Sequence, residues 1–531
     1  MYKEDDGQIK LMDFISPFGQ LDPNNRWVKM SSMIPWTKYE EKYKSQFCTG
    51  IGAPAIKYRM AMGALIIKQQ TGRSDDGVLE EIMESPYKQY FIGLQEFTTE
   101  PPFSQSSMTN FRKYITAEMI NELNEDLFRK ANEKPEEPPS PTNPDGDSRG
   151  EQAETDDPAP LETTKTEDEP EPEKSQPETP QPKPEAVSVS NEIAENKGTL
   201  ILDATCAPSD IAYPTDINLL NEARIKLEGM IDTLYPHSIL NIKPRTYREE
   251  ARDEYIGFIF LKNPGTETIR EMLEKQLKYV KRDLKHIDNL LTMVPIDRLS
   301  NPQRQWLETI RLLYEQQLYM FKNKTHSVEN RIVSIGQPHV RPIKRGKAKA
   351  PYEFGAKVSI SLVDGFVFID LLSWDSYNEE TQLIRAVEAY KDNHGYYPER
   401  VLADQIYRNR NNRAYCKNLG IRLSGRPLGR PSATMEKEQK KQQARDAADR
   451  NAIEGKFGEG KQKYGLGRIM ARIKDSCETV ISLAFLCMNL NRRLRDLFAF
   501  FQKNRYPQVL GPAFSVFLLF FSVVFLAVFS F

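Results

Sequence analysis

The sequence predicts an α/β protein whose strand-bearing core is interrupted by an all-helical insertion and preceded by an N-terminal helical domain. Three observations support this: helically spaced apolar residues early in the chain, an acidic Pro-rich stretch after them, and short β-prone runs that later alternate with helices. We expect a helical domain (1–130), a linker (131–198), an α/β domain (199–505) with its insertion at about 217–330, and an apolar tail (506–531).

Residues 55–130 are expected to form helices with short breaks. Apolar residues recur at helical spacing in AIKYRMAMGALIIKQQTG, which Thr71-Gly72 ends, and Ser74 then caps SDDGVLEEIME. A third helix is predicted over MTNFRKYITAEMINELNEDLFRK. Two interpretations stay open: a DNA-binding helix-turn-helix, or a bundle used for dimerisation or packing, because this stretch is not basic.

An acidic stretch separates the helical domain from the rest of the chain. Residues 131–198 carry 6 basic and 19 acidic side chains, and Pro135 through Glu185 hold 13 of the 35 prolines and no aromatic residue. Such a segment cannot bury enough apolar area to offset its chain entropy, so we expect a disordered tether. Residues 199–531 carry a surplus of 13 positive charges, so the whole-chain net charge of −2 is a cancellation.

The second half of the chain alternates strand and helix signals. A β-prone run, TLILDAT, places Asp203 at the end of a strand, and a helical region follows at about 217–325. In KVSISLVDGFVFIDLLSWD, apolar residues alternate on both sides of Asp364-Gly365, a hairpin turn pair. A helix follows, then the strand RVLADQ ending in Asp404, the run GIRLSG and a mostly helical stretch.

The last segment differs in composition. From Val509 to Phe531 no residue is charged, and the stretch has about the 20 residues needed to span a bilayer. Three interpretations stay open: a membrane anchor, an extension packed on the domain, and a segment without function. The five scattered cysteines form no CxxC pair and the first residues lack a signal-peptide pattern, so a cytoplasmic location is expected.

Three acidic residues stand out by position: Asp203 and Asp404 at strand ends, and Glu454 in a helix. Carboxylates placed in this way can hold two divalent cations about 3.5–4 Å apart, which suits cleavage of a phosphodiester. Histidines and cysteines form no cluster, so carboxylates must hold any metal, which selects magnesium, manganese or calcium. Because the chain has 75 acidic residues, such a triple alone is weak evidence, and the surrounding charge matters.

That surrounding charge is basic. Residues 401–474 hold 18 basic and 7 acidic side chains, as an enzyme acting on a polyanion requires, because cations neutralise phosphates. The arginines expected to contact phosphates are Arg408, Arg410 and Arg413 just after Asp404, and Arg422, Arg426 and Arg430 around the loop SGRPLGRPS. The alternative is a solvated basic face without a ligand.

A spaced motif completes the set. In RNAIEGKFGEGK, Arg450, Glu454 and Lys461 have the spacing R-x3-E-x6-K, and the first two share one helix face. The motif resembles the signature of insertion-sequence DDE transposases of the superfamily often called four/five. DATCAPSDIAYPTDINLLNEAR, LADQIYRNRNNR, FGAKVSIS and the N-terminal SDDGVLEEI…FIGL…SSMTNFRKYI are also similar to these transposases. The resemblance covers about 40–130 and 199–495.

The resemblance implies an RNase H-like catalytic core. Asp203, Asp404 and Glu454 would be catalytic and would bind Mg²⁺, for which Mn²⁺ can substitute, while Arg450 and Lys461 would contact DNA. It also implies a prokaryotic DNA transposase that cleaves the ends of its own insertion sequence and joins the 3′-hydroxyl to target DNA. Its partners would be double-stranded DNA, as terminal inverted repeats and target, and a second copy of the chain.

Two features depart from the family pattern. The family has a tyrosine three residues before the arginine, where this sequence has Ala447, and the apolar tail has no counterpart. They keep open a second hypothesis, a DNA-binding protein that recognises terminal repeats without catalysis. The long gap between Asp203 and Asp404 agrees with a helical insertion between two strands, which need not move the strand ends.

Overall fold

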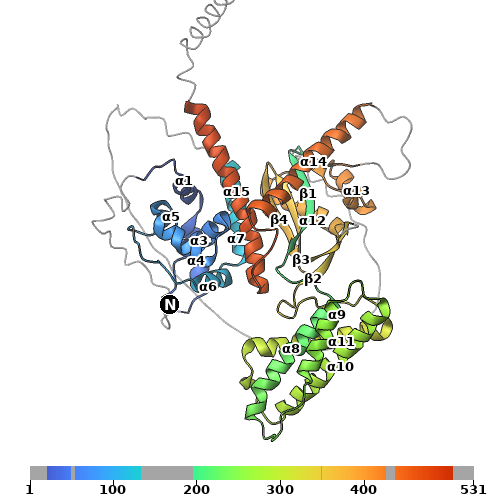
Figure 1. The fold of residues 1–531 in the computed structure, drawn as a ribbon. Coiled ribbons are helices and arrows are strands. Elements are labelled where there is room, and N and C mark those ends of the chain that lie inside the picture. Colours follow the sequence, from blue (N-terminus) through green and yellow to red (C-terminus); the bar gives the residue numbers. More distant parts are fainter. Residues whose placement is uncertain (1–20, 49–53, 133–194, 348–349, 426–436, 506–531) are drawn as a thin grey trace, which may run out of the picture. The chain divides into compact units, whose positions relative to one another are not determined.

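The structure is a computed structural model that describes residues 21–48, 54–132, 195–347, 350–425 and 437–505. It is a mixed α/β protein, as the sequence predicts (Figure 1). The predictions for most of the acidic linker, for the apolar tail, and for Arg426 and Arg430 lie outside the described residues. Within the part that the structure describes, no helix is both long and apolar enough to cross a membrane.

Seven helices form the N-terminal part that the structure describes. They are α1 (Arg26–Met33), α2 (Trp36–Lys44), α3 (Tyr58–Thr71), α4 (Asp75–Glu84), α5 (Pro86–Phe91), α6 (Ser107–Tyr114) and α7 (Ala117–Asn132). The predicted stop and cap are confirmed: Gly72 ends α3 with a φ of 68°, and the Ser74 side chain accepts a 3.1 Å hydrogen bond from the Gly77 amide.

The single helix predicted after this point is wrong, because the chain forms two helices, α6 and α7. Between them, buried Ile115 has an extended backbone, and the Thr116 hydroxyl accepts a 3.3 Å bond from the Met119 amide. The break turns Ile115 into the core while a side-chain cap starts α7, so local capping overrides continuous helical spacing.

Six strands form one mixed sheet. They are β1 (Thr199–Pro208), β2 (Arg341–Lys347), β3 (Ala350–Val363), β4 (Phe366–Ser373), β5 (Arg400–Leu402) and β6 (Arg422–Leu423). Their order is β2-β3-β1-β5-β6, and β4 also pairs with β3. β3 is antiparallel to β1, β2 and β4, whereas β1, β5 and β6 are parallel.

β1 is longer than predicted, so Asp203 lies within the strand and not at its end. β3 pairs with β1 as far as Pro208 opposite Gly355, whereas β5 pairs with it only as far as Ile201. The two backbones come so close that a Cβ on Gly355 would lie 2.1 Å from the Ala207 carbonyl oxygen. One antiparallel partner therefore extends the strand past the point where the parallel partner stops.

The hairpin predicted at Asp364-Gly365 is confirmed. β3 ends at Val363 and β4 begins at Phe366, so the loop has two residues. Both have positive φ, 50° for Asp364 and 84° for Gly365, which matches the twist that favours two-residue hairpins.

Helices occupy the remaining positions. After β1 come α8 (Asp216–Leu234), α9 (Arg248–Ile259), α10 (Thr266–Leu291) and α11 (Asn301–Asn323), which lie where the sequence predicts a helical region. α8, α10 and α11 share a hydrophobic core of their own, and α9 lies with them in Figure 1. After β4 come α12 (Gln382–His394), α13 (Arg410–Asn418), α14 (Lys437–Lys463) and α15 (Lys474–Arg505).

The two faces of β1 point into different cores. Leu200 and Leu202 join a cluster with α12, whereas Ile201 joins the large cluster that contains the N-terminal helices and α15. α15 contacts both α7 and β4. At that junction buried Asn489 donates to the Asn124 side chain at 2.8 Å and to the Val367 carbonyl at 2.7 Å.

Candidate active site at the end of a parallel strand pair

The register of β1 and β5 places two acidic residues side by side. Thr199 pairs with Arg400 and Ile201 with Leu402. Asp203 and Asp404 each come two residues after the last of these pairs. Because the strands are parallel, both carboxylates lie at the same edge of this strand pair.

α14 brings a cation and a third carboxylate to this edge. The Arg450 guanidinium lies 3.7 Å from Asp203 Oδ2 and 3.3 Å from Glu454 Oε1. Ile453 on the same helix is fully buried, so α14 packs its apolar side inward and carries these polar residues to the strands. Three of the predicted site residues are thus in contact, with the guanidinium between two carboxylates.

Asp203 is the most enclosed of the three carboxylates. Its side chain is 17% exposed, compared with 57% for Glu454. Burial raises the pKa of Asp203 to about 6, and the nearby Glu379 and Asp404 charges add to this, while the Ala204 amide and Arg450 act in the opposite direction. Asp203 therefore lacks enough positive charge to offset its burial.

Asp404 starts a short turn after β5. Its carboxylate accepts a 2.7 Å hydrogen bond from the Gln405 amide, at the start of the 3₁₀ turn Gln405–Tyr407. The side chain is exposed. Asp404 thus lies beside Asp203 but faces solvent, where a DNA strand has access.

The carboxylates do not form a ready-made metal site as they stand. Among the described residues, no group of three or more His, Cys, Asp or Glu side chains is arranged to hold a metal ion. The Arg450 guanidinium instead bridges Asp203 and Glu454. The chemistry of the donors still suits a hard cation, because all three predicted ligands are carboxylates.

The predicted DNA-contacting cations differ in what they do. Arg410 and Arg413 on α13 are exposed, and Lys461 lies about two turns beyond Glu454 on α14. Arg408 is partly buried and donates to the carbonyls of Leu423 at 2.8 Å and Ser424 at 2.6 Å.

These contacts give Arg408 a structural function, and burial lowers the pKa of its guanidinium. Arg422 was expected in a phosphate-binding loop. It lies in β6 and donates to Asp446 at 3.0 Å, so an internal carboxylate already engages it.

The sequence did not single out a second group of polar residues near Asp203. Glu379, which contributes to the raised pKa of Asp203, forms a 2.8 Å ion pair with Lys357 of β3. Asp370 of β4 accepts a 2.5 Å bond from Ser361, and burial raises its pKa to about 7. A signal for Asp370 was available, because it is the only charged residue in the strand FVFIDLLS.

Protein-family comparisons match two parts of the chain. A model described as a transposase DDE domain matches residues 401–491, and a transposase domain (DUF772) matches residues 16–114. Both matches support the similarity to insertion-sequence DDE transposases. The first match contains Asp404, Arg450 and Glu454, and Asp203 lies before it in the chain.

One curated relative of the chain is described as an uncharacterized protein, ORF8 in the nfe locus of Rhizobium meliloti. The two are 33% identical over 103 residues, which are 19% of this chain. The chain spans about half of the relative's length (49%). No solved structure matches the chain.

Proposed function

We propose that the chain is a DNA transposase that cleaves the ends of its own insertion sequence and joins the freed 3′-hydroxyl to target DNA. The observation that carries this proposal is the meeting of Asp203, Arg450 and Glu454 beside Asp404 at one edge of a parallel strand pair. The transposase family supports DNA as the partner.

Asp203, Asp404 and Glu454 would hold divalent cations, Mg²⁺ with Mn²⁺ as a substitute. Bound cations would supply charge stabilisation for phosphoryl transfer at the scissile phosphate. The under-compensated burial of Asp203 supports this assignment, because a cation would relieve it. The parallel pairing of β1 with β5 places Asp203 and Asp404 side by side, and α14 carries Glu454, which Arg450 connects to Asp203.

The cations of this chain would hold the DNA. Arg410 and Arg413 are exposed, and Lys461 lies on the helix that carries Glu454. Arg450 would exchange contacts between the carboxylates and a phosphate as DNA enters. The mixed sheet with its strand-borne aspartates supports an RNase H-like core, with α8–α11 as an insertion between β1 and β2. Paired cleavage of both ends of the mobile DNA would require two copies of the chain.

The test is cleavage of a duplex that carries the inverted repeat bordering the coding sequence, with Mg²⁺ present. We expect Asp404→Asn to lower the cleavage rate by about 100-fold or more, because it removes a negative charge that positions the cation. DNA binding, measured by gel shift, should stay within threefold of wild type. Equal cleavage by both proteins would overturn the catalytic assignment, and a wild type that binds but never cleaves would indicate a DNA-binding relic.

A further inference from the structure

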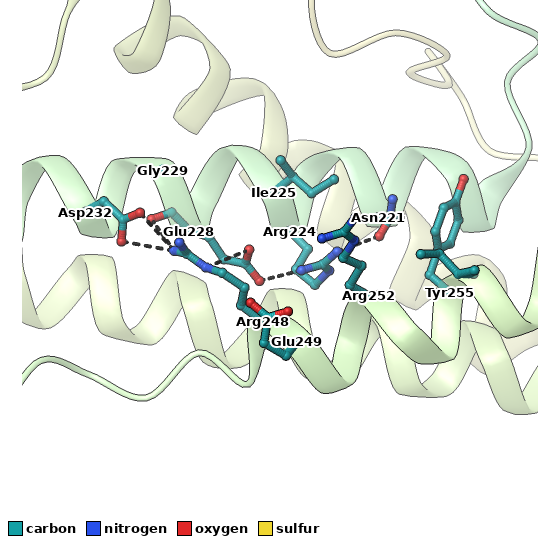
Figure 2. Close-up of a pocket in the computed structure, with 11 residues that line it drawn as sticks. Asn221, Arg224, Ile225, Glu228, Gly229, Asp232, Arg248, Glu249, Arg252 and Tyr255 are labelled. Carbon is teal, nitrogen blue, oxygen red and sulfur yellow. Dashed lines mark hydrogen bonds and ion pairs between the residues drawn. The ribbon is translucent and has the colours of Figure 1, made fainter.

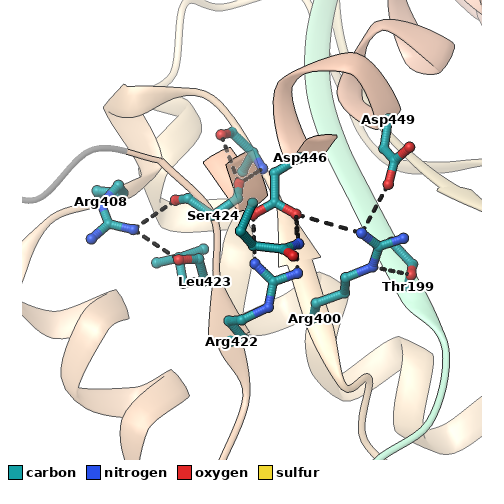
Figure 3. A network of polar contacts seen from close by, with 10 residues as sticks. Thr199, Arg400, Arg408, Arg422, Leu423, Ser424, Asp446 and Asp449 are labelled. Carbon is teal, nitrogen blue, oxygen red and sulfur yellow. Dashed lines mark hydrogen bonds and ion pairs between the residues drawn. The ribbon is translucent and has the colours of Figure 1, made fainter. Parts of the chain in front are cut away.

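A polar network connects the first residues of β1 and β5 to α14 (Figure 3). Along each of these elements, it precedes the acidic residue that the element carries or leads to. Its centre is Asp446 of α14, which is 5% exposed. Arg422 of β6 donates to Asp446 Oδ1 at 3.0 Å, and Arg400 of β5 lies 3.5 Å from the same oxygen. Two strands are thus tied to one helix through a single carboxylate, and the pairing with Arg422 holds the pKa of Asp446 below its usual value despite burial.

Arg400 joins the remaining elements. Its Nε donates to Thr199 Oγ1 of β1 at 2.7 Å, and its Nη1 forms a 2.8 Å ion pair with Asp449 of α14. The three-element junction, defined as Thr199, Arg400, Arg422, Asp446 and Asp449, therefore joins the three elements β1, β5 and α14, and Arg422 attaches β6 to it (Figure 3).

Along β1 and along β5, the same number of residues separates the junction from the acidic residue. Asp203 comes four residues after Thr199, and Asp404 comes four residues after Arg400. At about 3.3 Å per residue, each strand advances about 13 Å.

Glu454 comes eight residues after Asp446 on α14. At about 1.5 Å per residue, the helix advances about 12 Å, which matches the strands. The helix runs in the same direction as β1, because Asp446 contacts the strand starts while Arg450 contacts Asp203. The distance from this junction to the acidic residue is thus similar along β1, along β5 and along α14.

We infer that the three-element junction is a positioning device, in which Asp446 sets the height of Glu454 relative to Asp203 and Asp404. The inference rests on the proposed function. The Asp446 carboxylate is engaged by Arg400 and Arg422 and not by the acidic residues, so it would act through the placement of α14. A slip of α14 by one residue would move Glu454 by about 1.5 Å, enough to disturb a site that demands close geometry.

The experiment uses the full chain and the same repeat-bearing duplex. In Asp446→Asn we expect kcat for cleavage to fall at least 10-fold, with KM for the duplex within twofold of wild type. The Mg²⁺ concentration for half-maximal cleavage should rise, and without metal the α14 amides from 446 to 457 should exchange hydrogen faster. Arg422→Lys, which keeps the charge, should retain kcat within about threefold, whereas Arg422→Gln should lose more.

Asp288→Asn is the matched control. Asp288 is in an exposed inter-helix ion pair with Arg311, far along the chain from the junction. It should leave kcat and α14 exchange unchanged. A wild type that does not cleave overturns the proposed function and the positioning role together. If wild type is active and Asp446→Asn keeps more than half of the wild-type kcat, the positioning role of the junction is overturned and the proposed function is not. The same holds if the only change in Asp446→Asn is in KM. If Asp446→Asn does not fold, Arg422→Gln decides by the same criteria.

Discussion

Two regions of the chain combine arginines with carboxylates, and their charge balances differ. In the helical region, buried Glu228 and partly exposed Asp232 lie beside Arg224 and Arg248 (Figure 2), and Lys243 also pairs with Asp232. Arg224 lies 2.5 Å from Glu228, with the two side chains only 3% and 6% exposed. Glu228 pairs with Arg224 and Arg248, and Asp232 pairs with Lys243 and Arg248.

At the edge of the β1–β5 pair, by contrast, two carboxylates share one guanidinium and a third carboxylate lies near them. Arg450 contacts Asp203 and Glu454, and Asp404 adds a further negative charge beside Asp203. The difference appears in the pKa values: Asp203 is raised to about 6, whereas Asp232 lies below its usual value, because hydrogen bonds from Lys243 and Arg248 outweigh its burial.

The comparison sets a compensated group of ion pairs against an under-compensated one. The ion pair of Arg248 with Asp232 connects α8 and α9, which line a cavity of about 490 Å³. At the candidate site, two excess negative charges would attract a divalent cation. Burial also raises the pKa of Asp283, in the helical region, to about 7, so it is the grouping of Asp203 with Asp404, Glu454 and Arg450 that distinguishes the candidate site.

The largest expected effect tests the buried ion pair of Glu228 with Arg224. Glu228→Gln leaves Arg224 buried without its counter-charge, so the free energy of unfolding should fall by about 3–5 kcal/mol, measured by urea denaturation. The cleavage rate per folded molecule should not change. Glu222→Gln is the control, because Glu222 is in a half-exposed pair with Lys226, and it should cost less than about 0.5 kcal/mol. Equal losses in both variants would contradict the buried pairing.

The next effect tests the under-compensated charge of Asp203 through the pH dependence of stability. Well below pH 4, the Asp203 carboxyl is protonated in both the folded and the unfolded chain. As the pH rises towards 6, this carboxyl ionises first in the unfolded chain, because folding raises its pKa to about 6. The wild type therefore loses stability over this pH range. Without metal, Asp203→Asn should therefore gain about 1–3 kcal/mol relative to wild type between pH 4 and pH 7.

Added Mg²⁺ provides the control for this prediction. It should raise the melting temperature of wild type at pH 7 and leave that of Asp203→Asn unchanged, because the variant lacks the under-compensated carboxylate. Asp203→Asn should also lose cleavage. A stability difference that is constant across this pH range would show that Asp203 ionises normally and that the site has no charge deficit.

The smallest effects separate two arginines that the sequence treats alike. Arg413→Ala should weaken duplex binding several-fold and lower the slope of log affinity against log salt by about 1, because one phosphate contact is lost. Arg408→Ala should leave that slope unchanged and instead cost about 1–2 kcal/mol of stability, since the Leu423 and Ser424 carbonyls lose their donor. Fluorescence anisotropy across a salt series measures the slope, and thermal melts measure the stability of both variants. A lower slope in Arg408→Ala, with unchanged stability, would show that Arg408 contacts DNA.

Local signals in the sequence predict much of the fold. Ser74 caps a helix, Gly72 ends one and Asp364-Gly365 forms the hairpin turn, because each of these features depends on residues within a few positions. The acidic motifs could be proposed for a similar reason. Each is a short spaced pattern, and the spacing R-x3-E places Arg450 and Glu454 on one helix face before any tertiary contact is known.

The tertiary structure decides which charged residue meets which. Arg408 and Arg413 lie in one basic stretch, yet one supports β6 and the other faces solvent, because only the pairing of β5 with β6 brings carbonyl acceptors to Arg408. The same holds for Asp203, which lies within a strand because β3 extends β1 on one side only.

By itself, then, the sequence determined the end of α3 at Gly72, the cap at Ser74 and the hairpin turn at Asp364-Gly365, since backbone conformation at these points is a short-range property. Only the folded chain decided that Arg400 and Arg422 meet Asp446, from positions 46 and 24 residues away, and that Arg450 bridges Asp203 and Glu454. Charge compensation depends on distance in space, and at these separations along the chain it is the sheet register and the packing of α14 that set that distance.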